Sequence, residues 1–285
     1  MEVVDNEASE ALLNVKFSII GFIAGLIPVP YAIINELSQW ILNLIFGAIL
    51  SVTAGKLLFP KHFDVFWRAV VIGIGVSFGA ILFIHPDLEL FRPFGAYFVI
   101  LFTFHYFEYV ITGLTNPSNL STDSYLLNHS LQYWMAAMAS WVEYFIELYF
   151  FPELKTSKVV LWIGVLICIA FDLLRKIAMF HAGASFSHIV QSTKKDDHKL
   201  VTRGVFAYFR HPSYVGWFYW SLGTQLVLSN PICFALYAYV SWLFFNERVY
   251  VEEYSLLQFF GSQYHKYQRQ VPVGIPFVQG FTMDE

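Results

Sequence analysis

The longest uncharged stretch of the chain, residues 211–246, reads HPSYVGWFYWSLGTQLVLSNPICFALYAYVSWLFFN. A membrane-spanning helix needs about 20 apolar residues, so this stretch is too long for one span and suits two. Ser229, Asn230 and Pro231 lie near its middle and form a turn signal. We therefore predict a helical hairpin in the membrane, with spans at 213–228 and 231–246.

Six further apolar segments precede this hairpin, and charged residues separate them along the chain. The first three lack charges, whereas later ones contain ionisable side chains such as Glu108. Pro28 and Pro30 should kink the first helix. The sequence thus predicts an all-α, polytopic integral membrane protein with about eight transmembrane helices, the first six at residues 17–35, 37–55, 69–86, 93–113, 131–151 and 158–180.

The composition supports a lipid environment. The hydrophobic fraction is 57% and the charged fraction 13%, against about 45–50% and about 25% in soluble domains. A net charge of −4 lacks the basic excess that nucleic-acid binding requires. Cys168 and Cys233 lie inside apolar runs, which predicts buried thiols without a disulfide or metal framework.

The distribution of basic residues predicts the orientation in the membrane. If eight spans alternate and both termini share a side, that side receives fourteen of the 17 Lys and Arg residues. Arg92, Lys155 and Lys158 fall on the other side. The positive-inside rule makes the first side cytoplasmic. The N-terminal stretch, MEVVDNEASEALLNVK, is acidic where a signal peptide would be basic, so we expect the first apolar segment to be retained as a span.

Two polar stretches, 175–210 and 247–285, flank the hairpin and emerge together on the cytoplasmic side. We expect a site where they meet, in a cytoplasmic C-terminal catalytic region. Pro212 suits the first position of a helix, whose free N–H groups favour an anion. Arg248 and Glu252 share one face of a helix predicted from about 232 to a stop at Gly261, and 262–270 should form a short amphipathic helix.

These residues together strongly resemble the isoprenylcysteine carboxyl methyltransferase family. The resemblance covers about residues 160–285 closely, and the eight-span arrangement is that of its animal members. The matching pieces are His188-x-x-Gln191, HKLVTRGVFAYFRHPSYVGWFYWSLGTQ at 198–225, Asn230-Pro231-Ile232-Cys233, Arg248-x-x-x-Glu252-Glu253, Leu256-x-x-Phe259-Phe260-Gly261-x-x-Tyr264 and Val271-Pro272-x-Gly274-Ile275-Pro276-Phe277.

The resemblance implies methyl transfer from S-adenosylmethionine to the C-terminal carboxylate of a farnesylated or geranylgeranylated cysteine on processed CaaX proteins such as Ras-type GTPases. S-Adenosylhomocysteine would be the product. Arg248 would meet the substrate carboxylate, with Arg175 as a second cation. Endoplasmic reticulum residence is implied too. The residues implied to contact the cofactor are Gln191, His198, Lys199, Leu200, Val201, Phe206, His211, Pro212, Ser213, Tyr214 and Glu252.

The chemistry that the resemblance implies is consistent with the residues of this chain. A free C-terminal carboxylate has a pKa of about 3.3–3.7 and is already ionised near neutral pH, so it needs no general base. No metal is expected, and the chain has no HExxH or CxxC pattern. The prenyl tail partitions into the bilayer, a second partner, at about 0.8 kcal/mol per buried CH₂. A site at the cytosol–membrane boundary would serve both reactants.

Other functions remain open at this point. A related phospholipid amine methyltransferase would call for an acidic acceptor site in place of Arg248, and an NADPH-dependent sterol-type reductase for a basic cluster around a 2′-phosphate. A non-enzymatic transporter would call for ionisable residues along a mid-membrane path and an internal repeat. We divide the chain into five N-terminal spans at 1–157 and a three-span methyltransferase core at 158–285.

Overall fold

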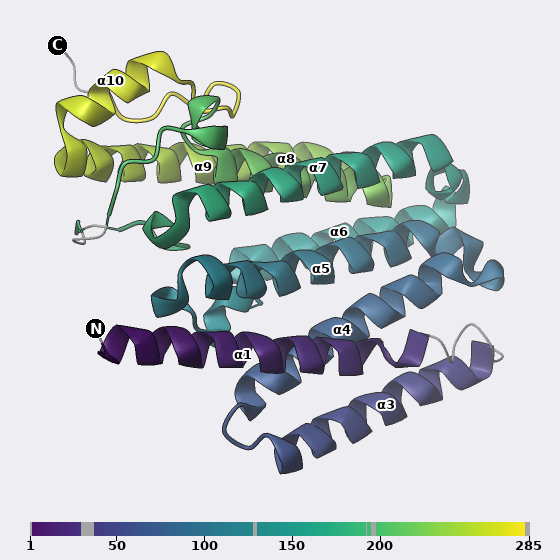
Figure 1. Ribbon diagram of the computed structural model, residues 1–285. Helices are drawn as coiled ribbons and strands as arrows, with labels where there is room; N and C mark the ends of the chain where they lie inside the picture. The colour runs from purple at the N-terminus through teal and green to yellow at the C-terminus, as the bar shows by residue number, and fades with distance from the viewer. Residues whose placement is uncertain (1, 30–36, 128–129, 192, 195–197, 283–285) are drawn as a thin grey trace.

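The computed structural model describes residues 2–29, 37–127, 130–191, 193–194 and 198–282, and these residues are helical or irregular, without strands. Figure 1 shows long, nearly parallel helices stacked in layers. Helices α7, α8 and α9 form one side of the stack, α5 and α6 its middle, and α1, α4 and α3 the other side. The chain enters α1 and leaves the C-terminal tail at the same end of the stack.

The long helices are α1 (Glu2–Leu26), α3 (Leu37–Leu58), α4 (Phe63–Ile84), α5 (Arg92–Thr115), α6 (Leu131–Phe150), α7 (Lys158–Ala182), α8 (Pro212–Leu228) and α9 (Pro231–Phe260), followed by the short α10 (Ser262–Gln270). Short 3₁₀ turns occupy the connections: η1 (Pro86–Phe91), η2 (Pro117–Asn119), η3 (Thr122–Tyr125), η4 (Pro152–Thr156), η5 (Gly183–Ser185) and η6 (Gly204–Ala207).

Each of the eight predicted spans corresponds to a helix. Four segments are long and apolar enough to cross a membrane by length and composition: Glu7–Leu26, Gln39–Leu58, Phe63–Ile84 and Pro86–Thr115. Helix α8 has 17 residues, and α7 carries Asp172, Arg175 and Lys176 in its second half. The predicted first span ran to residue 35, but 30–36 lie outside the described residues, as does the predicted kink at Pro30.

Local sequence signals determine where α8 ends and where α9 begins and ends. Ser229 adopts a left-handed conformation after α8, and Pro231 opens α9. Gly261, with φ of +52°, ends α9 after Phe260 and lets α10 turn back. The predicted hairpin turn, the predicted stop at Gly261 and the predicted short helix at 262–270 are therefore confirmed.

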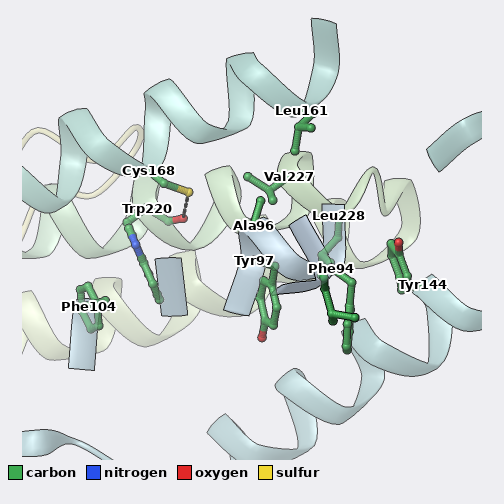
Figure 2. Close-up of a cluster of buried hydrophobic side chains, with 11 residues drawn as sticks. Phe94, Ala96, Tyr97, Phe104, Tyr144, Leu161, Cys168, Trp220, Val227 and Leu228 are labelled. Atoms are coloured by element: carbon green, nitrogen blue, oxygen red, sulfur yellow. Dashed lines mark hydrogen bonds between the residues drawn. The ribbon is translucent and has the colours of Figure 1, made fainter. Parts of the chain in front are cut away.

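Helix α8 packs closely against α7. A Cβ on Gly164 would lie 2.5 Å from the backbone nitrogen of Val227, so only glycine permits this approach of the two backbones. Around this contact lies the apolar cluster of Figure 2, in which Phe94, Tyr97 and Phe104 of α5 face Trp220, Val227 and Leu228 of α8. Cys168 and Cys233 are free, buried thiols, as predicted.

Hydrogen bonds and an ion pair hold the turn between α8 and α9 at the end of the stack opposite the termini. The Glu143 carboxylate of α6 accepts hydrogen bonds from the backbone N–H groups of Ile232 (2.7 Å) and Cys233 (2.6 Å) at the start of α9. Lys155 pairs with Glu147 at 2.6 Å. Glu143 therefore caps α9, whose first N–H groups have no partners within the helix. Glu147 and Lys155 form a structural ion pair.

Candidate functional site

A cavity lined by several ionisable side chains lies at the end of the stack where the 183–207 connection, the start of α8 and the C-terminal part of α9 converge. Its volume is about 120 Å³. Ten of the eleven residues expected to contact a cofactor line it: His198, Lys199, Leu200, Val201, Phe206, His211, Pro212, Ser213, Tyr214 and Glu252. Gln191 does not line it, and its amide donates instead to Ser187 Oγ at 2.9 Å and to the Ile189 carbonyl. We refer to this cavity as the donor pocket.

The first turn of α8 forms one wall of the donor pocket. Pro212 starts the helix, and the rings of His211 and Tyr214 lie parallel, with centroids 5.4 Å apart. The Tyr214 hydroxyl donates to the Glu252 carboxylate, and His211 Nδ1 lies 3.9 Å from the same carboxylate. A carboxylate and a helix N-terminus thus meet at one cavity, which suits a ligand that carries both charges.

The adjacent Glu253 points away from the pocket and is fully buried. Its carboxylate accepts from Arg210 Nε at 2.7 Å and pairs with His211 Nε2 at 3.0 Å; Tyr264 and Gln268 donate to it as well. Burial alone would raise the pKa of Glu253, but the hydrogen bonds and charges of His211 and Arg210 outweigh it and hold the pKa below its usual value.

A narrow passage, the throat, adjoins the donor pocket. Phe186, Ser187 and Tyr214 line both, and Arg248 lines the throat. Arg248 Nε donates to the Tyr214 hydroxyl at 2.9 Å, and its Nη2 donates to the His188 carbonyl at 2.6 Å. Among the described residues no hydrogen bond is found for Nη1 of Arg248. A fixed guanidinium with an uncommitted edge can receive a carboxylate.

Arg175 lines the throat as well, but its donors are engaged. Its Nε and Nη2 each donate to Glu108 at 2.7 Å, and its Nη1 donates to Ser213 Oγ at 2.5 Å. Lys176 and His188 also contact the Glu108 carboxylate. Glu108 comes from α5 and is 0% exposed. Glu108 is the one charged residue of the predicted span 93–113, and the sequence assigns it no catalytic role. A lone charge in an apolar helix is nevertheless a signal of a functional residue.

A third, apolar cavity of about 410 Å³ continues from the throat, and Trp217, Phe244 and Phe245 line both. It lies between α5, α6, α8 and α9, and residues such as Met135, Leu236 and Val240 line it. Met135 and Leu236 are exposed side chains, so the cavity borders the surface that faces lipid. We call it the apolar cavity.

The donor pocket has features that fit a zwitterionic, aromatic cofactor. His198 Nδ1 is buried and lacks a hydrogen-bond partner among the described residues, which is unusual for a buried polar atom. Phe206 and Phe260 supply aromatic surface beside it, and Glu252 supplies negative charge. Within the described parts of the chain, no group of His, Cys, Asp and Glu side chains could hold a metal ion.

Comparison with known proteins agrees with this geometry. Residues 162–258 match the model of the isoprenylcysteine carboxyl methyltransferase family. The chain is 49% identical to a protein-S-isoprenylcysteine O-methyltransferase of Tribolium castaneum, over 76% of each chain. It is 47% identical to the protein of that name from Homo sapiens, over 79% of this chain and 78% of the human one.

The fold has a close match among solved structures. A structure described as a eukaryotic intramembrane Ras methyltransferase, isoprenylcysteine carboxyl methyltransferase, superimposes with a TM-score of 0.87 at 42% sequence identity. The match covers 97% of this chain and 99% of the other, so it includes the N-terminal helices that the family model leaves out.

Proposed function

The chain belongs to the isoprenylcysteine carboxyl methyltransferase family of membrane enzymes, and we propose that it methylates the C-terminal carboxylate of a prenylated cysteine in the throat beside Arg248. The observation that carries this assignment is the order of three cavities, which share lining residues: a pocket lined by ionisable side chains, a throat with a cation and an apolar cavity. A CaaX-derived substrate, such as the processed end of a Ras-type GTPase, has a carboxylate and a lipid tail in matching order.

Arg248 positions the substrate carboxylate. Its guanidinium is held from two sides, by Tyr214 and by the His188 carbonyl, so its free edge presents donors in a fixed direction. Holding two reacting groups in a productive geometry accounts for much of the rate of a two-substrate reaction. Arg175 is a second cation on the throat wall, and Glu108 balances its charge.

The donor pocket holds S-adenosylmethionine in this proposal, and the bound cofactor supplies an electrophilic methyl group on a positively charged sulfur. Glu252 faces the positive end of the ligand, and the first turn of α8 at Pro212 faces its carboxylate. His198, Lys199, Leu200, Val201, Phe206, His211, Ser213 and Tyr214 complete the wall. We keep Gln191 as a cofactor contact by position in the family, although its amide is engaged within its own loop.

The throat needs no general base, because the carboxylate is ionised at neutral pH. Trp217, Phe244 and Phe245 surround it with apolar surface and exclude water from the nucleophile. The apolar cavity receives the farnesyl or geranylgeranyl tail directly from the bilayer. The substrate therefore arrives from lipid and the cofactor from water.

We extend the proposal to the membrane arrangement. The eight helices α1 and α3–α9 cross the bilayer, both termini face the cytoplasm, and the enzyme resides in the endoplasmic reticulum. The positive-inside distribution of Lys and Arg supports the orientation. Residues 1–157 form a five-span unit, and residues 158–285 form the core that holds the donor pocket.

The test uses purified protein in liposomes with labelled S-adenosylmethionine and N-acetyl-farnesylcysteine. We expect base-labile methyl ester, and we expect it to be lost in Arg248→Ala and Glu252→Ala. Lys266→Ala, which removes an exposed cation of α10, is the matched control and should keep the activity. S-Adenosylhomocysteine binding, measured by calorimetry, should weaken in Glu252→Ala and persist in Arg248→Ala.

A parallel reaction with phosphatidylethanolamine as the acceptor addresses the amine alternative. The throat offers a cation where an amine acceptor would need an anion, so we expect no labelled amine product. Labelled lipid without methyl ester would overturn the proposed acceptor. Failure to bind S-adenosylhomocysteine at all would overturn the proposed cofactor.

A further inference from the structure

Glu108 sits at the centre of a buried ionic cluster that reaches into the throat from outside the matched family region. It is a residue of α5, whereas the family model covers 162–258. Both of its carboxylate oxygens accept from Arg175, and Lys176 and His188 complete its surroundings. A fully buried carboxylate is retained only when paired in this way.

Each of the two hydrogen bonds that fix the Arg248 guanidinium is connected to Glu108 through neighbouring residues, and we call these two connections arms. In the first arm, Glu108 Oε2 lies 2.9 Å from Nε2 of His188, whose carbonyl accepts from Arg248 Nη2. In the second arm, Glu108 holds Arg175, which donates to Ser213 Oγ and carbonyl oxygen. Ser213 directly precedes Tyr214, whose hydroxyl accepts from Arg248 Nε.

Glu108 also sets the charge of the throat. Arg175 and Arg248 both line it, so two guanidinium groups face the same small space. Glu108 neutralises Arg175 through a bidentate pair, and Arg248 remains as the cation without a carboxylate of its own among the described residues. Without that pair, the substrate carboxylate would meet two cations.

We infer that Glu108 is a positioning residue for methyl transfer: it fixes Arg248 through His188 and Ser213, and it keeps Arg175 from binding the substrate carboxylate. This inference rests on the proposed function and adds a residue of α5 to the site. A carboxylate held by two guanidinium groups is stabilised before reaction more than in the transition state, where its charge is being lost. Such binding lowers KM and kcat together.

The test is Glu108→Gln, which keeps the side-chain shape and removes the charge. We expect kcat to fall about tenfold or more while KM for N-acetyl-farnesylcysteine stays unchanged or falls. The matched control is Asp172→Asn, which removes the other carboxylate that pairs with Lys176, at 3.1 Å. Among the described residues no hydrogen bond or ion pair joins Asp172 to Arg175 or His188, so we expect wild-type kcat and KM.

A second pair of variants tests the His188 arm without disturbing the buried carboxylate. His188→Gln retains an amide donor for Glu108, and His188→Ala does not. We expect His188→Gln to keep kcat within about threefold of wild type and His188→Ala to lose about tenfold, since a displaced positioning group costs rate in that range. If Glu108→Gln does not bind S-adenosylhomocysteine, we take that variant to be misfolded. The two His188 variants then test whether the contact between Glu108 and His188 positions Arg248.

The outcomes separate this inference from the proposed function. Methyl ester from wild type and from Asp172→Asn, together with a kcat loss confined to Glu108→Gln and His188→Ala, supports the inference. Wild-type kcat in Glu108→Gln, a rise in KM at unchanged kcat, or equal kcat in the two His188 variants overturns it and leaves the methyltransferase activity standing. Absence of ester from wild type would instead reject the proposed function.

Discussion

At the scale of single residues, the geometry of Arg248 matters more than its charge. Its planar guanidinium donates to two fixed acceptors and still offers an edge to a ligand, whereas a lysine ammonium offers one point charge. We therefore expect Arg248→Lys to lower kcat/KM about 10²-fold, a typical cost of misplacing a reacting group. Initial rates of ester formation measure this, with Arg203→Lys on the exposed connection as control. A lysine variant with near wild-type kcat/KM would contradict the argument.

Glu252 and Glu253 are adjacent in sequence and differ in surroundings. Glu252 lines the donor pocket, whereas Glu253 joins α9 to Arg210, α10 and the tail. We expect Glu253→Gln to destabilise the protein by about 3 kcal/mol, because it leaves buried Arg210 without its carboxylate. Glu252→Gln should weaken S-adenosylhomocysteine binding and leave the melting temperature nearly unchanged. Thermal unfolding in detergent measures the first effect and calorimetry the second.

Glu253 also predicts that the folded protein loses stability in acid. The folded-state pKa of Glu253 lies below its ordinary value of 4.5, so its stabilising contribution is complete above that pH. It is lost as pH falls through the lower folded value, when Arg210 and His211 lose the charge that they contact. The melting temperature of wild type should therefore drop below about pH 4.5 more steeply than that of Glu253→Gln; parallel curves would contradict this.

The structure brings ten of the eleven expected cofactor residues to one cavity, whereas the ion pairs beside it were not predicted. The resemblance to the family supplied these residues by position. Nine of the ten lie in 198–214, and the tenth, Glu252, shares a helical face with Arg248. The contact between Glu108 and Arg175 joins positions 67 apart, and no local pattern encodes it. The resemblance implied Arg175 as a second cation at the substrate carboxylate, whereas in the structure its guanidinium pairs with Glu108 of another helix. Whether either arginine touches substrate stays a prediction.

At the scale of elements, α9 connects the three cavities along its length. Phe245 lines the throat, and Cys233 lines the far part of the apolar cavity twelve residues earlier, about 18 Å at 1.5 Å per residue. One extra isoprene unit adds four chain bonds of about 1.5 Å each, or roughly 5 Å. The far end, near Cys233 and Tyr97, is therefore where a geranylgeranyl tail would extend beyond a farnesyl one.

This geometry predicts a chain-length effect. Cys233→Phe should lower kcat/KM for a geranylgeranylcysteine about tenfold more than for a farnesylcysteine, because overpacking a filled site costs about 1–3 kcal/mol. Ala235→Phe adds the same ring to the same helix at an exposed position away from the cavity, and it should affect both substrates alike. Competition between the two substrates in one reaction measures the ratio. An equal loss for both substrates in Cys233→Phe would place the far end of the tail elsewhere.

The helices themselves were the most predictable elements, because charge-free runs and Pro or Gly signals mark their ends. The errors concern boundaries. Helix α4 begins at Phe63 and not near 69, since Asp64 and Arg68 pair across one turn and let the helix include both charges. Helix α1 likewise extends back into the polar N-terminus. Charge-free runs therefore identify the apolar part of a helix and do not mark the residue at which the helix starts.

At the scale of the whole molecule, the proposed function requires a water-soluble cofactor and a lipid-anchored substrate to meet at one point. Figure 1 shows α10 at the end of the stack where both termini lie, and Tyr264 and Tyr267 of α10 line the donor pocket there. The apolar cavity runs from the throat along α9 and opens beside exposed apolar side chains. The sequence predicted the two environments from composition, whereas their connection through the throat depends on packing among distant helices.

That arrangement works only if the donor-pocket end faces the cytosol, where the cofactor is. Single cysteines test this: Gln263→Cys on α10 marks the donor-pocket end, and Glu153→Cys in η4 marks the opposite end; both positions are exposed. The native Cys168 and Cys233 are buried and should stay unlabelled. In sealed microsomes, an impermeant maleimide should label Gln263→Cys, and Glu153→Cys should react only after permeabilisation. The reverse pattern would place the donor pocket in the lumen. Labelling of both positions in sealed vesicles would reject an odd number of spans between η4 and α10, and with it the three crossings by α7, α8 and α9.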